Sequence, residues 1–110
     1  MLLWCGLVSS SNKLVYVKEH MASGELVVAI CDKDLLGKRL VDGDRVFYVD
    51  PDFYGGRVVS TKEALRLIDR ASIANLVGNN IVYEAIRGGY VHPDAVIEIN
   101  GVKHAQVIRM

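Results

Sequence analysis

The sequence predicts an α+β protein: a two-layer sandwich in which two helices pack on one face of a mainly antiparallel sheet. Three observations support this class: β-branched and aromatic segments come first, two amphipathic helical segments follow, and a hairpin ends the chain. Strands and helices segregated in this way are typical of α+β domains. The 110 residues fit one domain, and 51% hydrophobic residues can form a core without a disulfide or a metal. We assign that domain to residues 13–110 and interpret residues 1–12 as an N-terminal extension or an edge strand.

The first half of the chain predicts three strands separated by turns. Residues 14–19 and 26–31 are rich in β-branched and apolar side chains, and the break at Ser23-Gly24 predicts an antiparallel hairpin. Residues 32–44 are polar and turn-rich, so we expect a loop there. Residues 45–49 form the expected third strand, which must stop before Pro51 because proline cannot donate to a ladder.

Two helices are predicted in the second half. Ser60 and Glu63 match the capping box, in which each side chain accepts from the other residue's backbone N–H. Apolar residues at helical spacing follow, so we expect a helix over residues 61–77 that ends at Gly78, with a break near Ser72 as an alternative. Asn79 or Asn80 then caps a second helix, which ends at Gly88.

The chain ends with a predicted hairpin over residues 96–99 and 102–108. Asn100-Gly101 between two apolar runs is a strong signal for a two-residue type I′ turn. Such a short loop determines the register and predicts a cross-strand ion pair between Glu98 and Lys103. The expected pairs are Ile99 with Val102, Glu98 with Lys103, and Ile97 with His104.

Composition excludes several classes of protein. Lys plus Arg and Asp plus Glu each number 13, so no global field attracts nucleic acid or an anionic membrane, although a local basic face remains open. Cys5 and Cys31 show no C-x-x-C spacing and are expected to be buried thiols. Because no apolar run is long enough for a membrane span, we expect a cytoplasmic protein, and no motif predicts a metal or a cofactor.

A charged segment after the second strand is the first candidate binding site. Its basic side chains could bind a phosphate, although the P-loop spacing is missing and a solvated, ion-paired loop is the alternative. The two aspartates are two positions apart, as a hard-metal site requires, but aspartates at strand ends also form turns. The candidates are Asp32, Lys33, Asp34, Lys38 and Arg39.

An aromatic pair beside two glycines is the second candidate. Exposed rings next to an arginine could stack on a nucleobase, and the alternative is that the rings seal the core while the glycines turn the chain. The candidates are Phe53, Tyr54, Gly55, Gly56 and Arg57.

The third candidate lies between the two predicted helices and in the last strand. Asn75, Gly78 and Asn80 form a possible backbone-lined corner at the start of the second helix, where anions are favoured. His104 falls among apolar neighbours, where a histidine is usually a hydrogen-bonded core residue. In an enzyme acting on a small phosphorylated or acidic substrate, Asp32 or Asp34 would be the base and His104 an acid or base.

Four segments in this order resemble the archaeal domain-of-unknown-function family 424. They are Cys-Asp-Lys-Asp-Leu-Leu-Gly-Lys at 31–38, Phe-Tyr-Gly-Gly at 53–56, Ala-Asn-Leu-Val-Gly at 74–78 and Asn-Gly-Val-Lys-His-Ala-Gln at 100–106. The resemblance covers residues 13–109 and implies a small archaeal cytosolic protein with a two-layer α/β sandwich, no established activity and an association with translation components. Two features depart from the family pattern: residues 1–12, and Lys103 where a proline is more usual.

These observations leave three functions open. The leading hypothesis is a non-catalytic module that binds RNA or a ribonucleoprotein. The alternatives are the enzyme described above and a protein–protein adaptor, which could pair or form a homodimer through the C-terminal edge strand, residues 106–110.

Overall fold

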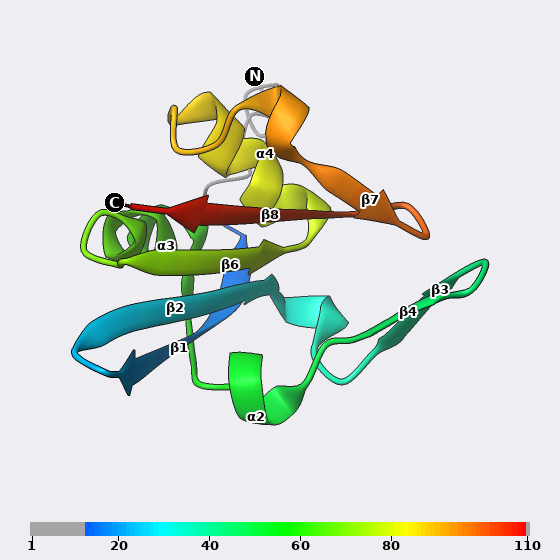
Figure 1. Cartoon of the computed structure of the whole chain (residues 1–110), viewed down its shortest axis with the longest axis horizontal. Coiled ribbons are helices and arrows are strands. Elements are labelled where there is room, and N and C mark those ends of the chain that lie inside the picture. The colour runs from blue at the N-terminus through cyan, green and yellow to red at the C-terminus, as the bar shows by residue number, and fades with distance from the viewer. Residues whose placement is uncertain (1–12, 110) are drawn as a thin grey trace, which may run out of the picture.

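The computed structural model describes residues 13–109, which form a six-stranded sheet, three α-helices and a separate two-stranded ribbon (Figure 1). The order of the strands in the sheet is β5-β1-β2-β6-β8-β7. Their bounds are Leu14–Ala22 for β1, Glu25–Asp32 for β2, Arg57–Ser60 for β5, Ile73–Val77 for β6, Ile97–Ile99 for β7 and Val102–Ile108 for β8.

Four of the five neighbouring pairs in this sheet are antiparallel, and β2 with β6 is the parallel pair. The predicted hairpin of β1 and β2 is confirmed, with Ala22 opposite Glu25. The predicted register of β7 and β8 is also confirmed, since Ile97 lies opposite His104. Lys103 Nζ lies 3.1 Å from Glu98 Oε1, so the expected ion pair forms.

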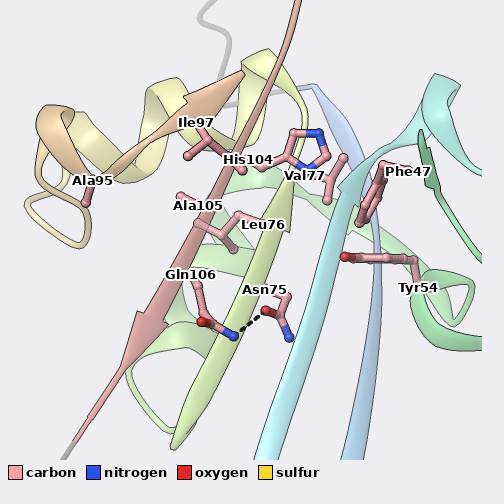
Figure 2. A pocket seen from close by; sticks show the side chains of 10 residues that line it. All are labelled: Phe47, Tyr54, Asn75, Leu76, Val77, Ala95, Ile97, His104, Ala105 and Gln106. Atoms are coloured by element: carbon pink, nitrogen blue, oxygen red, sulfur yellow. Dashed lines mark hydrogen bonds between the residues drawn. The ribbon is translucent and has the colours of Figure 1, made fainter. Parts of the chain in front are cut away.

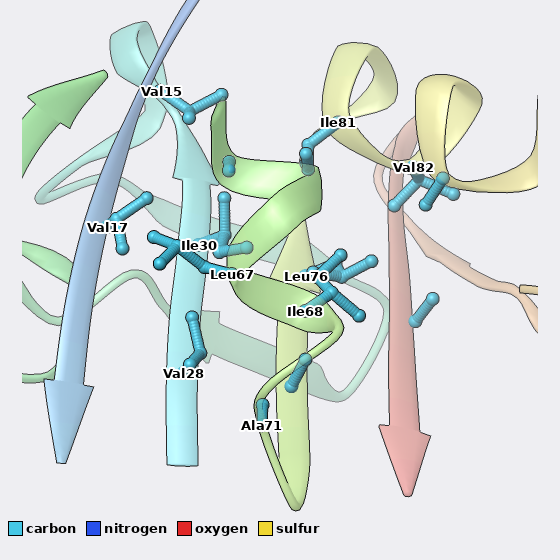
Figure 3. Close-up of a cluster of buried hydrophobic side chains, with 14 of the residues drawn as sticks. Val15, Val17, Val28, Ile30, Leu67, Ile68, Ala71, Leu76, Ile81 and Val82 are labelled. Atoms are coloured by element: carbon cyan, nitrogen blue, oxygen red, sulfur yellow. The ribbon is translucent and has the colours of Figure 1, made fainter. Parts of the chain in front are cut away.

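Helices α3 (Thr61–Ile68) and α4 (Asn79–Arg87) cover one face of the sheet. The core between these helices and the sheet is aliphatic. It includes Val28, Ile30 and Leu76 from the strands, Ile68 from α3 and Ile81 from α4 (Figure 3). Every one of these five side chains is at most 1% exposed. The helices and the sheet therefore exclude water from this core.

The opposite face is covered over part of its area by a different set of elements. These are a 3₁₀ turn at Lys33–Leu35, the one-turn helix α2 (Pro51–Tyr54) and the ribbon of β3 (Arg39–Asp42) and β4 (Arg45–Tyr48). A second cluster joins Ala29 and Cys31 of the sheet to Leu40, Val49 and Tyr54 of this cover. The α+β class is confirmed, but packing is not limited to the helical face.

The predicted helix over residues 61–77 was wrong in its second half. The helix ends at Ile68, and residues 73–77 are β6, in the middle of the sheet. Ala74 and Leu76 face the helices, while Asn75 and Val77 face away. This strand-like alternation was not recognised because the spacing of the apolar residues is also compatible with a helix. Ser60 does accept from the backbone N–H of Glu63, but no return bond from the Glu63 side chain forms.

The expected loop over residues 32–44 and the third strand were also partly wrong. The predicted loop contains β3, and the predicted third strand is β4. These two strands pair with each other and form a separate ribbon, so β4 is not part of the main sheet. Figure 1 shows this ribbon extending from the body of the molecule. We call residues 39–48 the arm.

Candidate functional site

The predicted site residues separate into two regions that do not meet. Asp32, Gly78 and Asn80 lie where β2 and β6 end, with Lys33 and Asp34 beside them. Arg39 begins the arm and Lys38 precedes it, whereas Phe53 and Tyr54 belong to α2 and Arg57 begins β5. Asn75 and His104 line a pocket together with Phe47 of the arm and Tyr54 of α2.

At the strand ends, Asp32 caps helix α4 from 48 positions away in the sequence. Its two carboxylate oxygens accept from the backbone N–H groups of Asn80 (2.9 Å) and Ile81 (3.0 Å). Burial raises the pKa of Asp32, and the two N–H groups oppose that rise. Gly78 has a φ of +129°, and a Cβ on it would overlap the Asp32 carboxyl group, so only glycine fits between β6 and α4.

Neither asparagine caps α4 with its own side chain, contrary to the expectation for Asn79 or Asn80. The cap residue is Gly78, and the Asn80 side chain instead donates to Thr61 Oγ1 at 3.0 Å. Because the Asp32 carboxylate already occupies the helix N-terminus, this corner does not present its N–H groups to a ligand anion. A pocket of about 540 Å³ beside it is lined by both aspartates together with Lys13 and Lys33.

The aromatic pair at 53–54 is not the exposed stacking surface that the sequence suggested. Tyr54 is 5% exposed and belongs to the second cluster, while Phe53 is half-buried and stacks on His20 with ring centroids 4.8 Å apart. Gly56 allows close approach, since a Cβ there would overlap the carbonyl oxygen of Val17. Arg57 forms an ion pair with Glu19 at 3.4 Å. This segment therefore attaches α2 to the sheet.

The exposed ring is Tyr48, on the outer face of the arm. Its side chain is 47% exposed, and the guanidinium carbon of its cross-strand partner Arg39 lies 5.6 Å from the ring centroid. Val41 and Val46, which are also cross-strand partners, are about half exposed on the same face. Of these four residues only Arg39 was a candidate from the sequence, although Asp42-Gly43 between two alternating runs is a hairpin signal that predicts the arm.

The arm is held against the β7–β8 hairpin by polar contacts. Arg45 Nη2 donates to the carbonyl of Glu98 (3.0 Å), and the Asn100 N–H donates to Asp42 Oδ2 (3.0 Å). Arg45 also lies 3.6 Å from Asp42 in an exposed ion pair. An isolated two-stranded ribbon is marginally stable, so these contacts and the buried Leu40 position the arm.

Under the arm lies a pocket of about 310 Å³ (Figure 2). Phe47 of the arm forms one wall, and its ring meets that of His104 edge-on, with centroids 4.6 Å apart. On the sheet, Gln106 Nε2 donates to Asn75 Oδ1 at 2.9 Å. We call this the arm pocket; its lining is Phe47, Tyr54, Asn75, Leu76, Val77, Ala95, Ile97, His104, Ala105 and Gln106.

His104 is buried among apolar groups as expected, but it is not a satisfied core histidine. The residue is 8% exposed, and its Nε2 has no hydrogen-bond partner within residues 13–109. Burial and, to a smaller extent, the nearby positive charge of Arg45 lower the pKa of His104, so the ring is neutral at physiological pH. Burial raises the pKa of Tyr54 to about 12, so its hydroxyl also stays neutral.

The acid–base pair suggested for an enzyme does not come together. Asp32 lines the pocket at the strand ends, whereas His104 lines the arm pocket, and both oxygens of Asp32 are engaged by α4. In the described part of the chain, no three His, Cys, Asp or Glu side chains gather as a metal site requires. The structure therefore does not bring Asp32 and His104 together as an acid–base pair.

Cys31 is a buried free thiol, and its burial raises its pKa to about 12; Cys5 lies outside the described residues.

Strand β8 pairs with β6 from His104 to Ile108 but with β7 only as far as His104. Among the described strands, none pairs with the outer side of residues 106–108, while β8 itself is interior to the sheet.

None of the helices in residues 13–109 combines the length and hydropathy of a membrane span.

Fold and site together define a small α+β protein with a mixed sheet and a ligand-sized pocket on the face opposite its two longer helices. The chain belongs to the family described as "Protein of unknown function (DUF424)", whose model matches residues 20–110. This confirms the resemblance that the four sequence segments indicated.

The fold is also similar to that of a solved structure. The crystal structure of an uncharacterized conserved protein from Methanopyrus kandleri is similar to this chain, with a TM-score of 0.74 and 26% identity. The match covers 88% of this chain and 95% of that one. None of the curated proteins matches the sequence.

Proposed function

We propose that this protein is a non-catalytic module that binds single-stranded RNA through the arm. The observation that supports it is the exposed ring of Tyr48 beside the guanidinium of Arg39, on a ribbon that extends from the body of the protein. Proteins that bind single strands stack bases on such rings and place cations next to them for the backbone. The arm provides both groups on one face.

Tyr48 takes the base-stacking role that the sequence suggested for Phe53 and Tyr54, and two of the basic residues suggested by the sequence, Lys38 and Arg39, keep their role as phosphate contacts. Lys38 and Arg39 are exposed at the base of the arm and have no carboxylate partner within residues 13–109. If each neutralises one phosphate, the logarithm of affinity should fall with the logarithm of salt with a slope of about −1.4. A zero net charge is compatible with such a shallow dependence.

Fluorescence anisotropy with labelled, unstructured RNA oligonucleotides tests this proposal. Tyr48→Ala should weaken binding about tenfold or more, because a stacked base contributes about 1–3 kcal/mol. Arg39→Gln should weaken binding and make the salt slope less negative. The matched controls are Tyr83→Ala, which removes an exposed ring from α4, and Arg66→Gln on α3. Equal affinities of the Tyr48→Ala and Tyr83→Ala proteins would refute a role for the arm in RNA binding.

A protein partner is the second candidate, and the exposed pair of Val41 and Val46 favours it. Exposed apolar side chains beside an aromatic ring and an arginine are also typical of protein interfaces. A pull-down from archaeal lysate with and without nuclease separates the two functions. Partners that survive nuclease and are lost with Val41→Ser and Val46→Ser indicate an adaptor, whereas partners lost with nuclease indicate RNA.

A further inference from the structure

The arm pocket has the size and the chemistry of a ligand site. Its volume of about 310 Å³ is at the lower end of the range for small-molecule pockets. None of its ten lining residues is Asp, Glu, Lys or Arg. A phosphate or a carboxylate buried there would have no charged side chain in the lining to contact, which favours a neutral group for the buried part of a ligand.

Several hydrogen-bonding groups in this pocket have no partner in residues 13–109. His104 Nε2 is buried and has no hydrogen-bond partner in the described part of the chain, which is rare in native proteins. The Tyr54 hydroxyl is directed toward the sheet (Figure 2) and makes no hydrogen bond with residues 13–109. The bond between Asn75 and Gln106 leaves the amide nitrogen of Asn75 and the amide oxygen of Gln106 without a partner among the described residues.

These groups are of the kind that recognise the polar edge of a planar heterocycle. Gln106 Oε1 and Asn75 Nδ2 lie at the two outer ends of the amide–amide bond (Figure 2), and side-chain amides are the groups that pair with base edges. A neutral imidazole adds one donor and one acceptor. The Phe47 and Tyr54 rings provide apolar walls, as in proteins that hold an unstacked base of RNA.

We propose that the arm pocket binds one neutral nitrogen heterocycle of the nucleobase type, with His104, Asn75 and Gln106 contacting its polar edge. This inference rests on the proposed function for the source of the base, which would be an unpaired nucleotide of the RNA held by Tyr48 and Arg39. A free nucleoside has the same chemistry, and the experiment below separates the two sources.

The first measurement is an NMR titration of the wild-type protein with adenosine, guanosine, cytidine and uridine, and with ribose 5-phosphate as the probe without a base. At least one nucleoside should shift the side-chain amide signals of Asn75 and Gln106 and the ring signals of His104. Ribose 5-phosphate should leave them unchanged.

The second measurement is binding of the nucleoside and of the RNA oligonucleotide to pocket variants. His104→Phe keeps an aromatic ring at this position but removes both ring nitrogens, and Asn75→Ala removes the side-chain amide. Each substitution should weaken nucleoside binding about tenfold, the equivalent of about 1.4 kcal/mol. His92→Phe, at an exposed histidine of the Pro93–Ala95 turn, is the matched control. The wild-type titration decides the question if a variant fails to fold.

The outcomes distinguish the two proposals. Nucleoside shifts at the pocket, together with oligonucleotide binding that depends on both the pocket and Tyr48, support both. Oligonucleotide binding that depends on Tyr48 without nucleoside shifts overturns the pocket and leaves the RNA module. Nucleoside binding without oligonucleotide binding supports a free-nucleoside site and overturns the RNA module. If neither probe binds, both proposals are wrong.

Discussion

Removing the Asp32 carboxylate should destabilise the protein more than any other single change in the charged 32–39 segment. This side chain accepts from two backbone N–H groups at the start of α4, at 2.9 and 3.0 Å, and it is half-buried. In Asp32→Ala both donors lose their acceptor in a place that water enters poorly. In Asp32→Asn one acceptor oxygen remains.

The size of the effect follows from the contacts and from the pKa of Asp32. Loss of an N-cap acceptor costs about 0.5–2 kcal/mol, and an unpaired buried donor about 1–3 kcal/mol. The raised pKa of Asp32 shows that burying the charge offsets part of the gain, so the charge itself is not the main stabilising factor. We therefore expect a loss of about 2–3 kcal/mol for Asp32→Ala and about 1 kcal/mol for Asp32→Asn.

Urea denaturation followed by circular dichroism measures both variants. With an ordinary urea slope, Asp32→Ala should lower the midpoint by about 1–2 M. Asp34→Ala is the matched control, because Asp34 is exposed, two positions away and makes no hydrogen bond within residues 13–109; it should change stability by less than about 0.5 kcal/mol. If Asp32→Asn were as unstable as Asp32→Ala, the charge would matter and the reasoning from the pKa would be wrong.

Two further predictions concern other parts of the fold. Gly56→Ala should lower stability by about 1–3 kcal/mol or more in thermal denaturation, because its Cβ would overlap the Val17 carbonyl in β1; an unchanged melting temperature would contradict this contact. Acidification should destabilise the wild type through His104, since its folded pKa lies below the unfolded value of about 6.5. This contribution is complete above the unfolded pKa and is lost as pH falls toward the folded one, where unfolding takes up a proton. Urea midpoints at several pH values should show a weaker acid dependence in His104→Phe than in the wild type, and parallel curves would exclude His104 as the cause.

The parts of the fold that were predicted correctly depend on contacts between near neighbours in the chain. The turn at Asn100-Gly101 fixes the register of β7 and β8, and Ser60 caps α3 by accepting from the N–H of Glu63, three residues further along the chain. The failure at residues 73–77 is of another kind. A short apolar run is compatible with a helix or a strand, and its pairing with β2 across more than 40 residues made it a strand.

For the site, the sequence identified some of the residues that line the arm pocket, but it did not show which side chains would be buried and which exposed. His104 and Asn75 were candidates and line the arm pocket, but Phe47, Tyr48 and Gln106 were not anticipated. Which ring of the arm region is buried depends on how α2 and the arm pack on the sheet. That packing buried Tyr54 and left Tyr48 in solvent.

The sequence by itself therefore determined the α+β class, the two hairpins of the main sheet, the start of α3 and the family to which the chain belongs. Local turn chemistry and hydrophobic alternation suffice for these features, because the groups involved are close along the chain. Only the tertiary structure decided that Asp32 caps α4, that β6 runs parallel to β2, and that the arm closes a pocket over His104. These features join residues about 45–60 positions apart, and such contacts form only when the whole core has packed.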